Sequence, residues 1–242
     1  WVKKTADVEL TPDFEYYRSK AKKTDFNIYG KVNYQVVDGL NAYVDLQYRH
    51  IDYKMQDPRD SYLGTDFTGA YVIDEKYDFF NPKFGLNYDI TPNHKVYASY
   101  AISHKEPVRN NFQKYYADME KAIKDGKDGK ISKPVAERLN DLEVGYKYQS
   151  SKFTADANFY YMNYKNQFVL TGEIDNIGEA ITRNLDKSYR LGVELEAAWM
   201  PVNWFRWDAN ATWSKNRVKD LTIQLEDGSN YTIEGESPLS FS

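Results

Sequence analysis

Apolar and polar residues alternate over unusually long stretches of this sequence, and residues 188–214 show the alternation most clearly. Every second residue from Leu191 to Trp199 is apolar, and the same pattern returns from Phe205 to Trp213. Successive side chains of a β-strand point to opposite faces of a sheet, whereas a helix repeats every 3.6 residues. The stretch therefore predicts a long β-hairpin with one apolar face and one polar face.

The same alternation recurs in three further pairs of segments, each joined by a short polar connection. These pairs are residues 26–36 with 40–50, 84–90 with 96–102, and 142–148 with 153–161. Together the four hairpins predict an all-β fold, an antiparallel meander of about eight long amphipathic strands. The remaining segments predict mainly loop at 1–25, a loop at 170–184, and a small polar hairpin at 218–233 beyond the main strands.

The length of these strands favours a membrane. Ten residues at about 3.3 Å each, tilted by about 40°, rise about 25 Å, which matches the apolar band of an outer-membrane barrel. None of the positions that the eight predicted strands assign to the apolar face is Asp, Glu, Lys or Arg, but a soluble sandwich would also keep charge out of its core. Short connections on one side, longer ones on the other, and aromatic residues near strand ends favour part of a transmembrane β-barrel. Those aromatic residues are Tyr48, Tyr88, Tyr148, Trp199, Phe205 and Trp213.

Composition narrows the possible functions. Lys plus Arg number 32 and Asp plus Glu 36, so a net charge of −4 offers no general attraction to nucleic acid. Cysteine is absent, which excludes disulfides and thiol chemistry. His50, His94 and His104 are far apart and lack the spacing of metal ligands, and no nucleophile is paired with a base. We therefore expect no enzyme activity, no catalytic residue, no metal site and no cofactor.

Charged residues of the polar face are balanced in sign and predict a solvated wall. In a barrel this wall would contact a plug or a ligand. Its members are Glu143, Asp156, Glu194, Glu196 and Asp208 with Lys83, Arg190 and Arg206.

Ligand contacts are expected from the loops, the longest of which covers residues 105–138, with a short helix at 115–124. Cationic and aromatic side chains there suit anionic chelates or sugars. The candidate ligand-binding residues are Tyr62, Tyr71, His104, Lys105, Arg109, Asn110, Tyr115 and Tyr116.

Three segments resemble the barrel domain of TonB-dependent outer-membrane receptors. They are VYASYAISHKEPVRNNF at 96–112, ERLNDLEVGYKY with FYYMNYKNQFV within 137–169, and NLDKSYRLGVELE at 184–196. Their order and spacing are those of the family. The sequence Lys105-Glu106-Pro107 departs from the Arg-x-Pro usual at that position in the family.

The resemblance implies a location in the outer membrane of a Gram-negative bacterium, in contact with its lipid. It also implies active uptake of a scarce solute such as an iron-siderophore, haem, cobalamin or a glycan. Residues 1–242 would then be part of the barrel, without the remaining strands and without the plug domain through which such receptors engage the TonB complex.

Two other classes of protein fit parts of the pattern. One is a soluble all-β module that binds a ligand such as a carbohydrate, and the other is a small eight-stranded outer-membrane barrel of adhesin type. For an isolated piece of a barrel, we further expect self-association through the strand edges at 26–36 and 205–214 or through the apolar face, because unpaired edges and exposed apolar surfaces seek partners.

Overall fold

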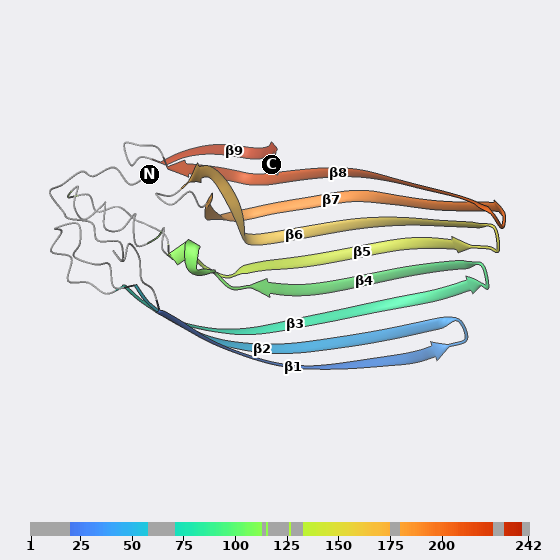
Figure 1. Cartoon of the computed structure of the whole chain (residues 1–242), viewed down its shortest axis with the longest axis horizontal. Coiled ribbons are helices and arrows are strands. Elements are labelled where there is room, and N and C mark those ends of the chain that lie inside the picture. The colour runs from blue at the N-terminus through green and yellow to red at the C-terminus, as the bar shows by residue number, and fades with distance from the viewer. Residues whose placement is uncertain are drawn as a thin grey trace, which may run out of the picture. The chain divides into compact units, whose positions relative to one another are not determined.

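The computed structural model describes residues 20–57, 71–112, 115, 126, 133–174, 180–224 and 230–238. They form one antiparallel sheet of nine strands in sequence order, which confirms the predicted all-β meander (Figure 1). The strands are β1 Lys20–Val37, β2 Leu40–Asp57, β3 Tyr71–Thr91, β4 His94–Lys105, β5 Glu137–Gln149, β6 Phe153–Ile174, β7 Ala180–Val202, β8 Phe205–Gln224 and β9 Asn230–Pro238.

By its contacts the chain divides into two units. The first comprises Trp1–Asp25 and Ile51–Lys76, and it contains the start of β1, the end of β2 and the start of β3. Its described apolar side chains at 51, 53, 55 and 73 are buried. The second unit comprises Phe26–His50 and Tyr77–Ser242, and it contains the candidate site.

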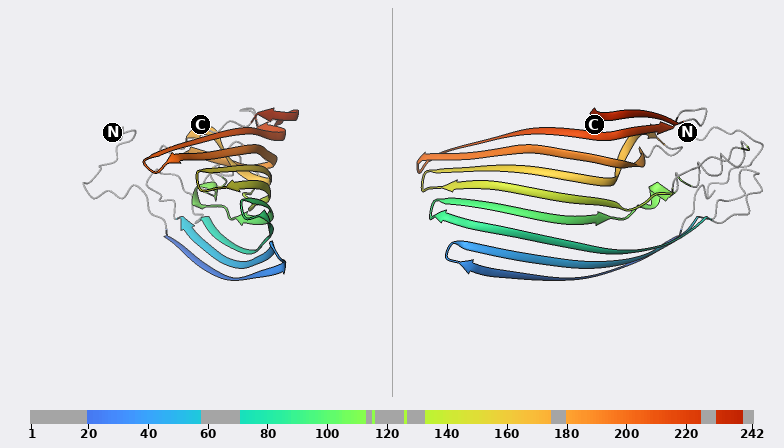
Figure 2. Two further views of the ribbon diagram at one scale, coloured as in Figure 1. Left: turned by 90° about the vertical axis from the view of Figure 1, so that its right-hand side faces the viewer. Right: turned by 180° about the vertical axis from the view of Figure 1, so that it is seen from behind.

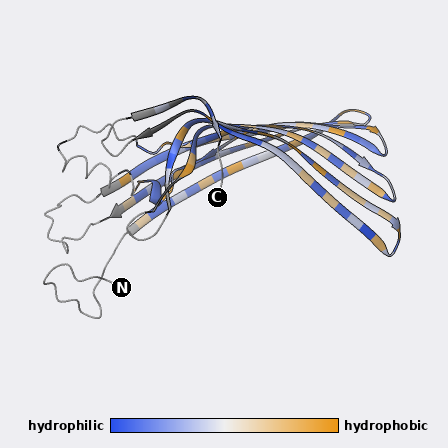
Figure 3. Ribbon diagram, turned by 90° about the horizontal axis from the view of Figure 1, so that it is seen from above, coloured by the Kyte–Doolittle hydropathy of each residue, from blue (hydrophilic) through white to orange (hydrophobic). Residues whose placement is uncertain are grey.

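Within the second unit the strand register places apolar residues opposite apolar residues. Val144 of β5 lies opposite Ala98 of β4 and Phe159 of β6, and Phe159 in turn lies opposite Val193 of β7. The next pairs along the same face are also apolar, for example Ala157 with Leu195. The alternation is visible along the strands in Figure 3. We call this side of the sheet the apolar face and the opposite side the polar face.

The apolar face is not a covered core. Val144 is 46% exposed, Leu195 43% and Trp207 52%. A soluble sandwich would bury such a face under a second sheet about 10 Å away, yet the described strands all belong to one sheet. The hydrophobic effect therefore requires another apolar environment to cover this face, which gives no support to a soluble binding module.

Four tight turns lie at one end of the strands, which we call the turn side, and the other end is the loop side (Figure 2). The first turn uses Gly39, whose φ of 78° favours glycine. Backbone hydrogen bonds also connect each of three turns to a later strand of the sheet. Asp89 N donates to Gly39 O at 2.8 Å, Gln149 N to Asn93 O at 2.9 Å, and Met200 N to Lys152 O at 2.8 Å.

Aromatic side chains border the apolar face on the turn side, as the sequence predicts, and Tyr100 lies toward the loop side. On the turn side, Tyr148 packs against Phe153 with ring centroids 6.0 Å apart, and Trp199 meets Phe205 edge to face at 6.5 Å. On the loop side, the hydroxyl of Tyr100 donates to Asn140 at 3.1 Å. Tyrosine and tryptophan are favoured where an apolar layer meets water, because each has an apolar body and a polar tip.

Tyrosine rings of the polar face cover glycines on the adjacent strands. The ring of Tyr97 lies over Gly145, directly across from it in the register, and Tyr160 lies over Gly192 in the same way. A Cβ atom at Gly145 would overlap the Tyr97 ring. The missing side chain of glycine thus creates the space that the tyrosine fills.

Several predicted boundaries were wrong because strands continue past the apolar band. Residues 20–25, predicted as loop, begin β1, and most of the predicted loop at 170–184 belongs to β6 and β7. The predicted hairpin at 218–233 is confirmed, since the end of β8 pairs antiparallel with β9 from Leu221–Ile233 to Gln224–Asn230. It does not stand beyond the main strands, because its first arm is a continuation of β8. Backbone hydrogen bonds between two strands do not require apolar side chains. A polar segment can therefore extend a strand wherever the adjacent strand is extended as well. Self-association through the strand edges stays a prediction.

The tyrosine that covers Gly145 generates a test of the packing. Replacing Gly145 with Val should lower the free energy of unfolding by about 1–3 kcal/mol, because the new side chain overlaps the Tyr97 ring. Gly30→Val is the matched control, since a Cβ at Gly30 meets no atom within 4 Å. Urea unfolding in lipid vesicles measures both variants. Equal loss of stability in the two would contradict the proposed packing.

Candidate functional site

The polar face carries the charged residues that the sequence assigned to it. Asp156 of β6 lies directly opposite Glu196 of β7, and Glu143 of β5 lies opposite Tyr160. Tyr97 links this face across strands, since its hydroxyl lies 3.2 Å from Asp156 Oδ1 and 3.2 Å from Asn158 Oδ1. The polar face is therefore a hydrogen-bonded surface suited to water, a solute or another polar domain.

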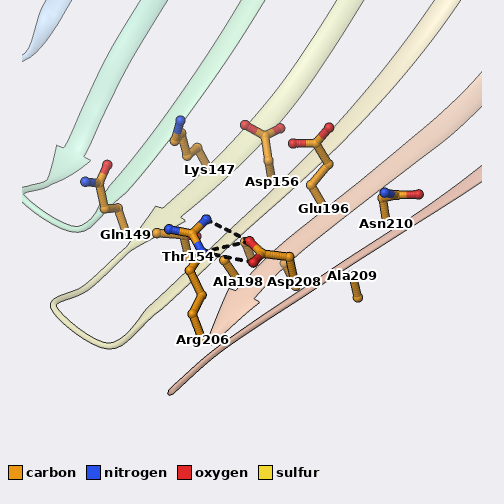
Figure 4. Close-up of a pocket in the computed structure, with 12 residues that line it drawn as sticks. Lys147, Gln149, Thr154, Asp156, Glu196, Ala198, Arg206, Asp208, Ala209 and Asn210 are labelled. Atoms are coloured by element: carbon orange, nitrogen blue, oxygen red, sulfur yellow. Dashed lines mark hydrogen bonds and ion pairs between the residues drawn. The ribbon is translucent and has the colours of Figure 1, made fainter. Parts of the chain in front are cut away.

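An open hollow of about 430 Å³ lies on the polar face near the turn side (Figure 4). Its lining includes Asp156, Glu196, Arg206 and Asp208. The guanidinium of Arg206 donates to Asp208, with Nη2 to Oδ1 at 2.7 Å and Nε to Oδ2 at 3.0 Å. Arg206 thus pairs with one of the three carboxylates, and Lys147 adds a second cation to the lining. The hollow can therefore both accept hydrogen bonds from a polar partner and donate them.

On the loop side, the connection after β4 begins with a residue held by β2. Both terminal nitrogens of Arg49 donate to Glu106, Nη1 to Oε2 at 3.0 Å and Nη2 to Oε1 at 3.1 Å. The Glu106 side chain is only 11% exposed. Two parallel charge-assisted hydrogen bonds of this kind fix both direction and distance. The next residue, Pro107, is fully buried and restricts the backbone further.

The following residues are held by a different strand. Residues 109–112 form a short helical turn, in which Asn111 N donates to Val108 O at 3.0 Å and Val108 N donates to Asn111 Oδ1 at 2.7 Å. The side-chain nitrogen of Asn111, Nδ2, also donates a hydrogen bond to the hydroxyl of Thr182 on β7. Phe112 is fully buried. The first seven residues of this long connection are therefore fixed to both β2 and β7.

The structure places the predicted ligand-binding residues in different settings. Lys105 ends β4, Arg109 and Asn110 lie in the helical turn, and Tyr115 is helical. Tyr71 begins β3 and belongs to the first unit. Tyr62 and Tyr116, together with most of the predicted helix at 115–124, lie outside the described residues.

The side chain of His104 contacts two residues of β3. Its Nδ1 lies 2.9 Å from Asn81 Oδ1, and its ring stacks on Phe79 with centroids 5.2 Å apart. His104 follows the last apolar position of β4, Ile102, and lies outside the apolar band. Burial, and to a smaller extent the Arg138 cation, lower the pKa of His104 below its usual value. His104 therefore favours its neutral form and acts as a hydrogen-bonding group.

His50 and His94 also have hydrogen-bond partners. His50 Nδ1 lies 2.7 Å from Asp78, and His94 Nδ1 lies 2.6 Å from the hydroxyl of Tyr146. Among the residues with described positions, no group of three or more His, Cys, Asp or Glu could hold a metal ion. No helix among them is long and apolar enough to cross a membrane.

Sequence reasoning missed the residues that fix the long connection. Arg49 and Glu106 are 57 positions apart, and Asn111 and Thr182 are 71 apart. Alternation indicates the face of a strand but not which distant loop returns to it. The available signal was Glu106 directly before Pro107, a charged residue at a position where the proline restricts the backbone.

Comparisons with known proteins agree with this architecture. The sequence matches the family described as "TonB dependent receptor-like, beta-barrel" over residues 4–241. No match was found among curated proteins.

Solved structures share the fold at low sequence identity. The siderophore receptor PiuA from Acinetobacter baumannii is 16% identical, with a TM-score of 0.62, and the match covers 88% of this chain and 28% of that chain. The FrpB iron transporter from Neisseria meningitidis is 18% identical, with a TM-score of 0.58, covering 85% of this chain and 28% of that chain. The copper transporter OprC is 14% identical, with a TM-score of 0.60, covering 82% of this chain and 28% of that one.

The chain thus spans little more than a quarter of each of these proteins. Its exposed apolar face, its aromatic borders and a family match over nearly its whole length lead to one conclusion. The chain belongs to the TonB-dependent receptor β-barrel family, whose members lie in the outer membrane of Gram-negative bacteria.

Proposed function

We propose that this chain forms part of the barrel wall of an outer-membrane receptor that imports a scarce solute. The apolar face would contact lipid, and the polar face would face the interior of the barrel. The observation that carries the proposal is this two-sided sheet, with exposed Val144 and Leu195 on one side and the charged hollow on the other. Such a wall binds and passes a solute without performing chemistry.

The nature of the solute is a proposal from the neighbouring structures. They are described as an iron transporter, a siderophore receptor and a copper transporter. We infer that an iron chelate is the solute, with contacts from the candidate residues of the loops. Energy would come from the TonB complex, acting through a plug domain outside the matched barrel region 4–241.

Cationic residues at the start of the long connection favour an anionic chelate. Lys105 is exposed at the end of β4, and Arg109 follows four residues later in the helical turn. Arg49 and Pro107 fix the backbone between them. A fixed backbone lowers the entropy lost when a ligand is bound, and cations attract an anion from a distance.

Deleting the gene that encodes this chain tests the proposed function. Cells should lose uptake of one class of solute from a panel of labelled ferric siderophores, haem, cobalamin and copper, each supplied at a limiting concentration. Complementation with the intact gene should restore that uptake. Unchanged uptake of every solute in the panel would contradict the proposal.

The role of the loop cations generates a second test, to be made with the solute that the panel identifies. The Lys105→Gln, Arg109→Gln double variant should bind an anionic chelate about tenfold more weakly, a loss of about 1.4 kcal/mol. Lys95→Gln, Lys152→Gln is the matched control, because Lys95 begins the turn side of β4 and Lys152 lies in a tight turn. Binding to whole cells measures both. Equal affinities would exclude these loop residues from recognition.

The Arg49–Glu106 pair generates a third test. Arg49→Met should lower the free energy of unfolding by about 1–3 kcal/mol, because it leaves the largely buried Glu106 carboxylate without this partner. The connection after β4 should also become more sensitive to protease added to intact cells. The double variant Arg49→Met, Glu106→Met should recover part of the stability, as expected for coupled residues.

Lys54→Met is the control for that experiment. Lys54 and Asp74 form an ion pair of 3.1 Å whose side chains are about half exposed, so its loss should change little. If Arg49→Met left both the stability and the protease sensitivity unchanged, the ion pair would not fix the connection.

A further inference from the structure

A row of cations crosses four adjacent strands on the loop side of the sheet. The register places Arg138 of β5 opposite Lys165 of β6, Lys165 opposite Lys187 of β7, and Lys187 opposite Lys219 of β8. All four side chains are exposed. Side chains directly opposite each other lie roughly 5 Å apart, and like charges in that position destabilise a sheet. We call these four residues the cation row.

The cation row lies on the apolar face. Arg138 is four residues from Leu142, and Lys187 is four residues from Leu191, so each cation points to the same side as its apolar neighbour. Leu142 and Leu191 both lie opposite Tyr161, within the apolar band. Four residues of strand correspond to about 13 Å. The cations therefore stand just beyond the apolar band, where a membrane would place its headgroups.

A shallow hollow of about 440 Å³ lies between the cation row and the apolar band. It is lined by Tyr100, Asn140, Leu142, Tyr161 and Asn163. The two asparagines lie opposite each other in the register, and Arg138 Nη2 donates to Asn140 Oδ1 at 3.3 Å. The hollow is thus polar toward the cations and apolar toward the band.

The far end of the cation row is partly neutralised. Glu236 of β9 lies opposite Lys219, accepts a hydrogen bond from Tyr189 at 2.9 Å and lies 3.4 Å from Lys215. The hydrogen bond from Tyr189 lowers the pKa of the Glu236 carboxyl, which keeps it charged. The amino group of Lys219 lies 5.7 Å from the centre of the Tyr189 ring. The other end of the row, beside the hollow, is where an external anion fits best.

We propose that the cation row binds the phosphate groups of an anionic lipid in the outer leaflet, with an acyl chain of that lipid along the hollow and the apolar band. Cations next to a membrane attract anionic headgroups, and the adjoining apolar face offers the chains a surface. A free phosphate would use only the cations. This site faces the membrane, and it rests on the outer-membrane location but not on which solute is imported.

The test compares two triple variants of the receptor that carries this chain, purified from outer membranes in mild detergent. The row variant removes three cations of the row, with the substitutions Lys165→Gln, Lys187→Gln and Lys219→Gln. The control variant removes three cations outside the row by the same chemical change, with the substitutions Lys31→Gln, Lys95→Gln and Lys152→Gln. Mass spectrometry of the intact protein counts bound phosphorylated lipid, and circular dichroism checks the strand content. The row variant should retain on the order of a hundredfold less lipid, and the control should retain as much as the unmodified receptor.

A third variant and a salt titration cover the case in which the row variant fails to fold. Lys165→Arg, Lys187→Arg, Lys219→Arg keeps the charges and should keep the lipid. Raising the salt concentration from 0.01 M to 1 M shortens the screening length from about 30 Å to about 3 Å, so the unmodified receptor should release lipid. The proposal is overturned if the folded row variant retains as much lipid as the control, or if salt releases no lipid. It is also overturned if inorganic phosphate, at the same concentration as the lipid, displaces the lipid completely.

Discussion

Backbone hydrogen bonding in a medium without water is the constraint on which the rest of this structure depends. Each unpaired N–H or C=O group in lipid costs several kcal/mol, so a strand that crosses the membrane must pair along its whole length with its neighbours. Strand β5 illustrates this, since its residues from Arg138 to Tyr148 pair with both β4 and β6 without interruption. Once the backbone is satisfied within the sheet, side chains are free to differ completely between the two faces.

The same regular register explains how the polar face keeps its shape. A flat row of small polar side chains would leave space between strands, and the rings of Tyr97 and Tyr160 fill it above Gly145 and Gly192. The hydroxyl of Tyr97 then reaches Asp156 and Asn158 on the next strand but one. The wall is thus fixed by side chains of the polar face as well as by its backbone.

Loop-side contacts connect parts of the chain that lie far apart in the sequence. Arg49 holds Glu106, and Thr182 accepts a hydrogen bond from Asn111, so a connection between β4 and β5 is fixed to β2 and β7. On the apolar face at the same end, the cation row joins β5 to β8. That end of the sheet therefore carries Lys105, proposed to contact a solute, on the polar face and the cation row on the apolar face.

The sequence by itself determined the strands and their faces. Alternation from Leu191 to Trp199 is a local property, because the direction of each side chain follows from the backbone of its own strand. The same reasoning located the tight turns and assigned Asp156 and Glu196 to the polar face. It failed at residues 170–184, where polar strand and loop have similar compositions and only pairing with a neighbour distinguishes them.

Tertiary structure decided everything that depends on register between strands. Arg138, Lys165, Lys187 and Lys219 are unremarkable when read along the chain, and they become a continuous row only when four strands align. The bidentate pair of Arg49 with Glu106 likewise joins residues 57 positions apart. A pattern with a period of two fixes the face of each side chain but not its partner, because a strand can slide by two residues and keep the same face.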